Sequence, residues 1–423
     1  MSAEEPVAER RGLPLLGGGK AAVGFILVVV LLDVLSSGII IPSLAPLIQE
    51  MEGGVAAAAG LYMGVFGMTW AFAQFVASPV LGALSDRFGR RRVILISLFG
   101  LAFDYVLLAL APSVGWLFLG RVISGLTAAS FSTANAYIAD VTPPEQRAQR
   151  FGLIGAAWGV GFIVGPAIGG VLADIDVRAP FWGAAALTFV GAAYGVFVLP
   201  ESLARENRSR FTWAKANPLG TLAFLRGHRE LLPLASVSFL LQLAHNVLPV
   251  VYVLYATNRY GWDLKATGLG MAAFGVGNIV VQMLLVKPVV ARVGEWGALF
   301  TGLSFGGLGF VAMGLAPSGL MFMLAAPVFC LIGLFNPGYQ GLATRRVAAN
   351  EQGRWQGANS SLMGLAGVVG PLMFGYAYAW EVSPDGLGLP GAAFYLAASL
   401  HVAAMLLALV LMARAPKPAK ASA

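Results

Sequence analysis

Twelve separate windows of mostly apolar residues run along this chain of 423 residues, and each is about 20 residues long or longer. A helix of that length crosses a hydrocarbon core about 30 Å thick, because each residue adds about 1.5 Å. The sequence therefore predicts an all-α membrane protein with twelve transmembrane helices near 21–48, 57–84, 91–111, 115–138, 151–173, 179–199, 231–256, 266–290, 296–316, 319–343, 356–380 and 388–413.

Composition supports this class and argues against several others. Hydrophobic residues make up 58% of the chain and charged residues 11%, whereas a soluble protein carries about a quarter charged residues. One cysteine excludes an intramolecular disulfide framework and a cysteine-based metal site. The sequence contains neither a phosphate-binding Gly-x4-Gly-Lys-Ser/Thr loop nor a His-Glu-x-x-His zinc motif. We therefore expect a transporter rather than an enzyme, driven by an ion gradient or running downhill.

The positions of Lys and Arg predict the orientation in the membrane. Most of them fall in the N-terminal segment, the central loop, the C-terminal tail and the loops after every second span, and only Arg178, Arg259 and Lys265 fall on the other side. Cytoplasmic loops retain basic residues, so we expect both termini in the cytoplasm. The net charge of +7 then reflects membrane topology and contact with lipid headgroups rather than nucleic-acid binding.

The chain also resembles itself at an offset of 205 residues. This offset places Gly89 on Gly294, Gly152 on Gly357 and the pair 165–166 on 370–371. Duplicated halves are typical of secondary transporters, whose two six-helix pseudo-repeats rock around a central site. The predicted organisation is a cytoplasmic segment 1–20, a six-helix bundle 21–199, a cytoplasmic loop 200–230, a six-helix bundle 231–413 and a cytoplasmic tail 414–423.

A loop after the second predicted span carries the most specific short motif, with Gly82, Asp86, Arg87, Gly89 and Arg90. An acidic residue at a helix end, a glycine turn and basic residues can hold two helix ends together through charge pairs. We predict a gating loop. The alternative is that these arginines only follow the rule that cytoplasmic loops are basic.

The fifth predicted span carries small residues at helical spacing: Gly152, Gly161, Gly165, Pro166 and Gly169. Glycines allow close approach of helix backbones, and the proline removes one main-chain hydrogen bond. This pattern predicts either a hinge or a generic helix contact.

Three charged residues stand out in the interior of predicted spans of the first half: Asp33, Asp104 and Arg121. Each costs about 2.5–3.5 kcal/mol at the bilayer centre unless it is paired or hydrated. Carboxylates in a partly dry cavity can bind and release protons during a transport cycle, and a nearby arginine can bias that equilibrium. We predict proton coupling through these groups. The alternative is a static ion pair.

Polar side chains in the predicted spans suggest where a substrate binds. Amides and aromatic residues in the second half suit a large, planar, amphipathic ligand better than a sugar, although membrane amides also join helices. His245 is either a proton carrier or a packing residue. The candidate substrate-binding residues are Gln74, Gln242, His245, Asn246, Asn278, Gln282, Asn336 and Gln340.

These motifs resemble a known family. The loop 82–92 is similar to the signature loop of the major facilitator superfamily, and 152–170 resembles the fifth-helix motif of its drug/proton antiporters. The segments 32–33, 38–42, 78–90, 104–105, 136–140 and 356–357 resemble the tetracycline/proton antiporters. The resemblance implies that Asp33 and Asp104 are essential carboxylates, that Asp86 and Arg90 belong to the gating loop, and that Arg121 acts in proton coupling.

The second half departs from that family at four positions. Gly306 lies where the resembling proteins have an aspartate, and Asn278 where some have histidine. His245 and Asn246 lie where glycine and glutamine are usual. Because those helices contribute to drug recognition in the resembling proteins, these departures bear on the substrate.

The sequence thus predicts a proton-coupled exporter of an amphipathic drug, with a tetracycline as the first candidate, in the bacterial inner membrane. We expect a monomer without a resident metal or cofactor, with the proton as coupling ion and magnesium present only in a drug chelate. Its partners are the drug, protons and the lipid bilayer. An exporter of other drugs, sugars or metabolites with the same fold, a downhill facilitator, and a membrane enzyme or receptor are the alternatives.

Overall fold

The computed structural model describes residues 19–128, 130–209, 211, 225, 227–228, 231–348, 351–386 and 388–414. Residues 1–18, most of the central loop and residues 415–423 lie outside this part, so the predictions for those stretches stay predictions. Every regular element in the described part is helical. The all-α class is confirmed.

The first half contains α1 to α8. Their bounds are Gly19–Ile39, Ile41–Met51, Ala56–Phe88, Arg90–Leu110, Val114–Thr127, Ser130–Val141, Pro144–Ile175 and Ala179–Val198. A short 3₁₀ turn, Arg205–Asn207, follows in the central loop.

The second half contains α10 to α18 with one π turn and one 3₁₀ turn. The helices are α10 Leu232–His245, α11 Val247–Tyr260, α12 Leu264–Val280, α13 Val286–Leu315, α14 Gly319–Leu324, α15 Ala326–Cys330, α16 Phe335–Thr344, α17 Gln352–Val382 and α18 Ala392–Arg414. The π turn is Val281–Leu285, between α12 and α13, and the 3₁₀ turn is Leu331–Leu334, between α15 and α16.

Eleven continuous stretches in the described part are long and apolar enough to cross a membrane. One of them, Leu264–Leu315, is 52 residues long and holds two of the predicted spans. The chain breaks helical geometry inside it at Gly294, where φ is 70° and ψ is −175°. The twelve predicted spans are therefore all present.

Several spans are interrupted where the sequence predicted continuous helices. The first breaks at Ile40 and the seventh at Asn246. Pro42 and Pro249 follow these breaks, and each lacks the N–H that would bond to the carbonyl four residues earlier. The fourth span breaks between α5 and α6, and the tenth at its 3₁₀ turn. The breaks thus recur at corresponding places in the two halves, which is typical of transporters whose interrupted helices surround the binding site.

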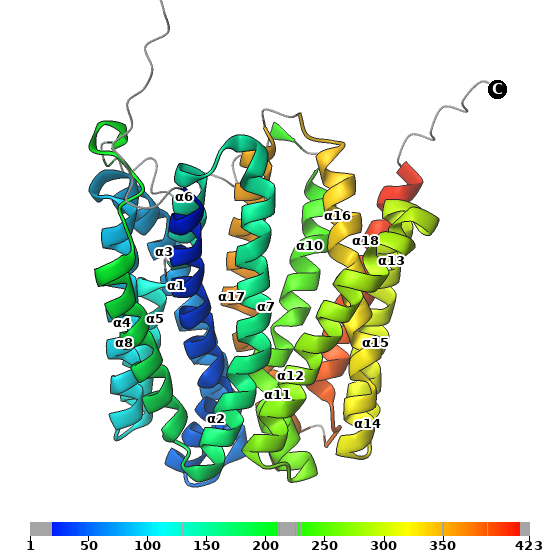
Figure 1. Ribbon diagram of the computed structural model, residues 1–423. Helices are drawn as coiled ribbons and strands as arrows, with labels where there is room; N and C mark the ends of the chain where they lie inside the picture. Colours follow the sequence, from blue (N-terminus) through cyan, green and yellow to red (C-terminus); the bar gives the residue numbers. More distant parts are fainter. Residues whose placement is uncertain are drawn as a thin grey trace, which may run out of the picture.

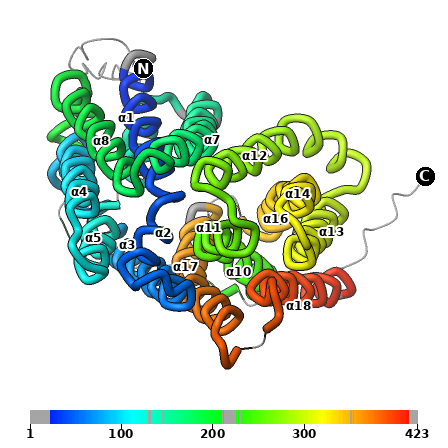
Figure 2. The backbone as a smooth tube through the Cα atoms, turned by 90° about the horizontal axis from the view of Figure 1, so that it is seen from below, coloured from blue at the N-terminus to red at the C-terminus, as the bar shows by residue number. Residues whose placement is uncertain are grey.

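The halves lie side by side (Figure 1), and Figure 2 shows α7 next to α12 and α3 next to α17. One end of the molecule holds Arg87, Arg90 and Arg345, together with the N-terminus of α1 and the C-terminus of α18. We call it the arginine-rich end. It is at the top of Figure 1. The opposite end, at the bottom, holds α2 and α14.

Small residues bring the two halves into contact toward the opposite end. A methyl group placed on Gly375 would lie 2.5 Å from the carbonyl oxygen of Gly60, and one placed on Gly170 would lie 3.2 Å from the Cα atom of Gly268. Such distances leave no room for larger side chains, so the backbones are in direct contact.

A polar contact reinforces this closure. The amides of Gln49 on α2 and Asn258 on α11 exchange hydrogen bonds of 2.9 and 3.2 Å. In this conformation the halves are therefore joined toward the opposite end.

Candidate functional site

The membrane-embedded charges of the first half are brought together by α1, α4 and α5. Asp104 is fully buried, and Arg121, 8% exposed, approaches it at 3.1 Å. Gly120 makes room for this pair, because a methyl group there would lie 2.5 Å from Oδ1 of Asp104. Ser124, one turn beyond Arg121, also lies beside the carboxylate. The arrangement is a dry, charge-assisted pair, which is stable only while both partners are charged.

Asp33 belongs to the same neighbourhood. It is half-buried on α1, and the charges of Asp33, Asp104 and Arg121 all act on the hydroxyl of Tyr105. That hydroxyl also lies 3.2 Å from Ser37 Oγ. The three predicted coupling residues therefore surround one buried tyrosine. The contact of Asp104 with Arg121 fits both the proton-coupling prediction and the static alternative, so their roles stay predictions.

The predicted gating loop is an ion-pair network centred on Arg90. Its guanidinium lies 2.5 Å from Asp86 and 3.1 Å from Asp140, the one acidic residue of α6. The main-chain N–H of Arg90 donates to Glu201 at 2.8 Å. Gly89 has φ of 104°, and the Glu201 carboxylate fills the place of its missing side chain. The loop thus ties α3 and α4 to α6 and to the chain beyond α8.

Two members of the predicted motif lie outside this network. Arg87 stacks on Phe88, with the guanidinium carbon 5.0 Å from the ring centre. A methyl group on Gly82 would meet no heavy atom within 4 Å. Sequence reasoning missed Asp140 and Glu201 as partners, because they are 50 and 111 residues from Arg90.

The second half repeats the ion pair of Arg90 and Asp140 with the charges exchanged. The offset of 205 places Arg90 on Glu295 and Asp140 on Arg345, and these two residues lie 2.8 Å apart. Gly294, with φ of 70°, precedes Glu295 as Gly89 precedes Arg90. The same geometry therefore holds with inverted charge.

The fifth-span motif packs against α1 at three of its glycines. Methyl groups on Gly161, Gly165 and Gly169 would lie 2.5, 2.7 and 2.0 Å from atoms of Val34, Gly38 and Ile39. The ring of Pro166 also lies against α1, where its Cδ atom would be 3.1 Å from a methyl group on Gly38, whereas its carbonyl oxygen is directed to α12 and would lie 2.2 Å from a methyl group on Gly268. Gly152 has no heavy atom within 4 Å of that position. The motif is a helix contact on both sides of α7, except at Gly152.

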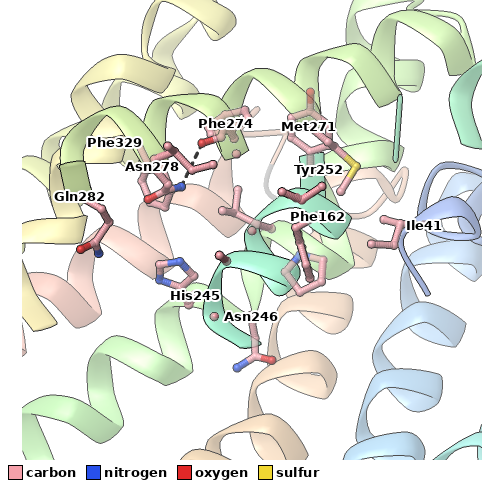
Figure 3. A pocket seen from close by; sticks show the side chains of 18 of the residues that line it. Ile41, Phe162, His245, Asn246, Tyr252, Met271, Phe274, Asn278, Gln282 and Phe329 are labelled. Atoms are coloured by element: carbon pink, nitrogen blue, oxygen red, sulfur yellow. Dashed lines mark hydrogen bonds between the residues drawn. The ribbon is translucent and has the colours of Figure 1, made fainter. Parts of the chain in front are cut away.

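A cavity of about 810 Å³ lies between the halves, bordered by α7, α10, α11, α12 and α15. Five of the predicted substrate residues line it: Gln242, His245, Asn246, Asn278 and Gln282. Figure 3 shows Gln282, Asn278 and His245 at one side of the cavity, with Phe162, Met271 and Ile41 at the other. The cavity is therefore itself amphipathic.

The other three predicted substrate residues are not among the lining of the large cavity or of a smaller one of about 180 Å³. Gln340 accepts a hydrogen bond of 3.0 Å from Gln356 near the arginine-rich end, and Asn336 is exposed on α16. Gln74 lies on α3, outside both linings. For these three positions, contact with a substrate stays a prediction.

Hydrogen bonds determine what the lining amides can offer to a ligand. The amide N–H groups of Asn278 and Asn246 donate to the main-chain oxygens of Phe274 and Gln242, at 3.0 and 2.8 Å. Figure 3 marks the first of these. Their carbonyl oxygens remain as acceptors. His245 lies against the ring of Phe329 at 5.6 Å.

Most of the lining was missed by sequence reasoning because it is apolar. Aromatic and methionine side chains form much of the wall: Phe162, Met271, Phe274, Met283 and Phe329. The lining contains no Asp, Glu, Lys or Arg. It therefore favours a large ligand that buries apolar surface and donates a few hydrogen bonds.

A second cavity of about 180 Å³ is lined both by one of the buried charges and by residues of the large cavity. Arg121 and Trp70 line it from the first half. Asn246 and Pro249, at the break between α10 and α11, line both cavities. The residues at this helix break thus belong to the walls of both the large cavity and the cavity that Arg121 lines.

Gly306 on α13 faces His401 on α18. A methyl group on Gly306 would lie 2.9 Å from Nε2 of this imidazole, which is 2% exposed. Its Nδ1–H donates to the carbonyl oxygen of Ala397 at 3.0 Å, and the ring meets Phe310 edge to face. The imidazole fills the space that a side chain at position 306 would need.

Comparison with known proteins identifies the family. The model of the Major Facilitator Superfamily matches residues 26–371 and 234–423. The chain belongs to this superfamily. It is 36% identical over 376 residues to the class C tetracycline resistance protein of Escherichia coli, covering 88% of this chain and 93% of that protein. Over 403 residues it is 34% identical to the class D protein of Salmonella ordonez, covering 94% and 98%. The predicted resemblance to this family is confirmed.

The fold has solved counterparts. The crystal structure of the human organic anion transporter TETRAN superimposes with a TM-score of 0.69 and 23% identity, covering 93% of this chain and 100% of that one. At this identity the likeness supports the fold alone. The chain is a multi-pass membrane protein with two six-helix pseudo-repeats.

Proposed function

We propose that this chain exports an amphipathic drug in exchange for protons, with tetracycline as the first candidate. One observation carries the proposal. A large uncharged cavity lies between the halves, and it shares the lining residues Asn246 and Pro249 with the smaller cavity that Arg121 lines. A ligand in the large cavity can therefore act on the Asp104–Arg121 pair through a shared wall. The names of the relatives at 34–36% identity support the substrate.

In this proposal, transport is coupled to protons because protonation changes the charge of Asp104 beside Arg121. When Asp104 is ionised it neutralises Arg121, and when it is protonated the arginine charge is left without its partner at 3.1 Å. The two protonation states therefore favour different arrangements of the surrounding helices. In the proposed cycle the outward-open protein takes up a proton on Asp33 or Asp104, turns inward and releases it. The protein then binds drug, and the two occupancies exclude each other.

The proposal also includes the location, orientation and oligomeric state of the protein. We place the arginine-rich end in the cytoplasm of a bacterium, at the inner membrane, because basic residues gather there. The opposite end then faces outward, and the present conformation is closed on that side. The protein acts as a monomer without a resident cofactor or catalytic activity, and magnesium enters only as part of a drug chelate.

Transport into everted vesicles tests the proposal. Labelled tetracycline is expected to accumulate when a proton gradient is present and to stop accumulating when a protonophore collapses it. Accumulation that is unchanged by the protonophore would identify a downhill facilitator. No accumulation of tetracycline under either condition would contradict the substrate.

Other drugs of similar shape are the second candidate. The lining carries no formal charge and much aromatic surface, so it does not single out one drug. A panel of amphipathic drugs and sugars, tested for protection of sensitive cells, separates the possibilities. We expect protection against drugs only, because an apolar wall leaves sugar hydroxyls without partners.

A further inference from the structure

The two carboxylates of the first half differ in how water reaches them. Asp33 on α1 is half-buried, whereas Asp104 on α4 is 0% exposed and its partner Arg121 is also buried. A proton from water can therefore bind Asp33 directly. It reaches Asp104 only through other protein groups or after the helices around it move apart.

The accessible carboxylate shares one face of α1 with a hydroxyl group. Ser37 lies one helical turn after Asp33 and is exposed, and Ile41, a further turn along the chain, lines the large cavity. Polar residues within a membrane span face the interior of the helix bundle or water rather than lipid. Asp33 and Ser37 therefore lie on the side of α1 that is accessible from inside the molecule.

Tyr105 connects this face of α1 to α4. It follows Asp104 in the chain, is 2% exposed, and its hydroxyl oxygen lies 3.2 Å from Oγ of Ser37. Either oxygen of this hydrogen bond can be the donor. The charges of Asp33 and Asp104 both act on the Tyr105 hydroxyl, and Asp33 acts on it more strongly. One buried hydroxyl is thus bonded to the accessible face and lies in the field of the sealed carboxylate.

Packing between the helices does not require this hydroxyl. A phenylalanine ring would fill the same space, and it would avoid the cost of removing a phenol group from water. The proposed export mechanism does not use the hydroxyl either. Its position between an accessible and a sealed carboxylate is what gives it a role.

We infer that Tyr105 passes the coupling proton between Asp33 and Asp104 through the hydrogen bond that joins it to Ser37. The inference rests on the proposed export function and adds to it a proton-transfer residue and an order of events. Asp33 exchanges protons with water, and Asp104 receives them at the ion pair.

The transfer leaves both hydroxyl groups unchanged. The Asp33 carboxyl group gives its proton to a hydroxyl oxygen, directly or through water, while that hydroxyl gives its own proton onward. Ser37 and Tyr105 are neutral before and after the transfer. Asp33 becomes a carboxylate and Asp104 a neutral carboxylic acid, so Arg121 loses the charge of its partner.

Rates of proton movement, measured beside drug binding, test this relay. In proteoliposomes with an internal pH dye, Tyr105→Phe should slow proton movement driven by a tetracycline gradient by about tenfold or more, because it removes a positioned proton-transfer group. Equilibrium binding of tetracycline should stay nearly unchanged, since Tyr105 is not among the residues that line either cavity.

Tyr339→Phe is the matched control. Tyr339 is 1% exposed, lies outside both cavity linings, and its hydroxyl donates to Asn359 at 2.8 Å. This variant also loses a buried hydroxyl hydrogen bond, but no carboxylate is among the groups that act on that hydroxyl. It should move protons at the original rate. A loss equal to that of Tyr105→Phe would show a general effect of packing and overturn the inference.

Ser37 tests the relay without changing the protein core, because this side chain is exposed. Ser37→Ala removes the hydrogen bond and should slow proton movement as Tyr105→Phe does. Ser37→Thr keeps a hydroxyl and should retain the original rate. An original rate in Ser37→Ala would overturn the relay, as would equal slowing in both Ser37 variants, since the hydroxyl would then not be the cause.

The outcomes separate the relay from the function. An original rate in Tyr105→Phe would overturn the relay and indicate that protons reach Asp104 from the small cavity that Arg121 lines, with proton-coupled export still standing. Absence of drug-driven proton movement in the unsubstituted protein would instead overturn the proposed function. If Tyr105→Phe fails to fold, the two Ser37 variants decide the inference.

Discussion

At the scale of single residues, the main feature is an ion pair buried inside the membrane-spanning region, where an unpaired charge is strongly unfavourable. Asp104 is removed from water and held by Arg121 at 3.1 Å. Such a pair contributes little net stability, yet removing one partner leaves an uncompensated charge. This asymmetry makes the pair sensitive to a single proton.

The pair yields a stability prediction. Asp104→Asn should destabilise the protein by about 3–5 kcal/mol, because Arg121 keeps its charge without a partner. Asp104→Asn combined with Arg121→Gln should recover most of that loss. Thermal unfolding in detergent measures both, with Asp174→Asn on an exposed part of α7 as control. Equal losses in the single and double variants would show that the charge is not the cause.

Two glycines of the gating loop should differ sharply when replaced. Gly89→Ala forces a side chain into a backbone conformation that costs about 1–3 kcal/mol and into the space of the Glu201 carboxylate. Gly82→Ala meets no atom within 4 Å. We expect Gly89→Ala to lower the unfolding temperature and drug efflux, and Gly82→Ala to change neither. Similar behaviour of the two variants would contradict the assigned network.

At the scale of helices, the sequence predicts the number and order of the membrane spans better than it predicts where a span is interrupted. Windows of apolar residues found all twelve spans, since length and hydropathy are local properties. The breaks at Ile40 and Asn246 were not predicted, although Pro42 and Pro249 were visible. A proline inside a membrane helix either bends it or interrupts it, and tertiary contacts decide which.

For the candidate site, too, the sequence predicted some features and missed others. Asp33, Asp104 and Arg121 were predicted because charge inside an apolar window is a strong local signal, and the structure places them around one tyrosine, while their role in coupling stays a prediction. The sequence predicted only the amides and His245 in the wall of the large cavity, because a phenylalanine or methionine such as Phe274 or Met271 looks the same in sequence whether it faces lipid, protein or a ligand. Gln74, Asn336 and Gln340 lie outside the linings of the two cavities described above, and their contact with a ligand stays a prediction.

The fifth-span motif gives a prediction for a helix pair. Gly169→Ala would place a methyl group 2.0 Å from the carbonyl oxygen of Ile39 and push α1 away from α7. Gly152→Ala meets no neighbour within 4 Å and should be neutral or slightly stabilising, because alanine favours a helix by about 1 kcal/mol over glycine. Unfolding temperature and efflux test both. Tolerance of Gly169→Ala would contradict the close contact.

At the scale of the whole molecule, the two halves meet toward the opposite end. Transport requires that the closed end open, so the contacts that join it must break in every cycle. The pair Gln49 and Asn258 is one of these contacts.

Locking that end should stop transport. A bifunctional thiol reagent applied to Gln49→Cys combined with Asn258→Cys, in a Cys330→Ala background, should abolish tetracycline uptake into everted vesicles. Reductive cleavage of the link should restore uptake. Either cysteine variant alone, treated with the same reagent, serves as control. Undiminished uptake after complete cross-linking would show that this end does not open.

Drug-driven proton movement tests the central claim, that buried carboxylates couple the drug to the proton. Purified protein in proteoliposomes carrying an internal pH dye is exposed to a tetracycline gradient. The unsubstituted protein should move protons against the drug, and the variant with both Asp33→Asn and Asp104→Asn should move none while still inserting and folding. Proton movement of undiminished rate in that double variant would contradict the account.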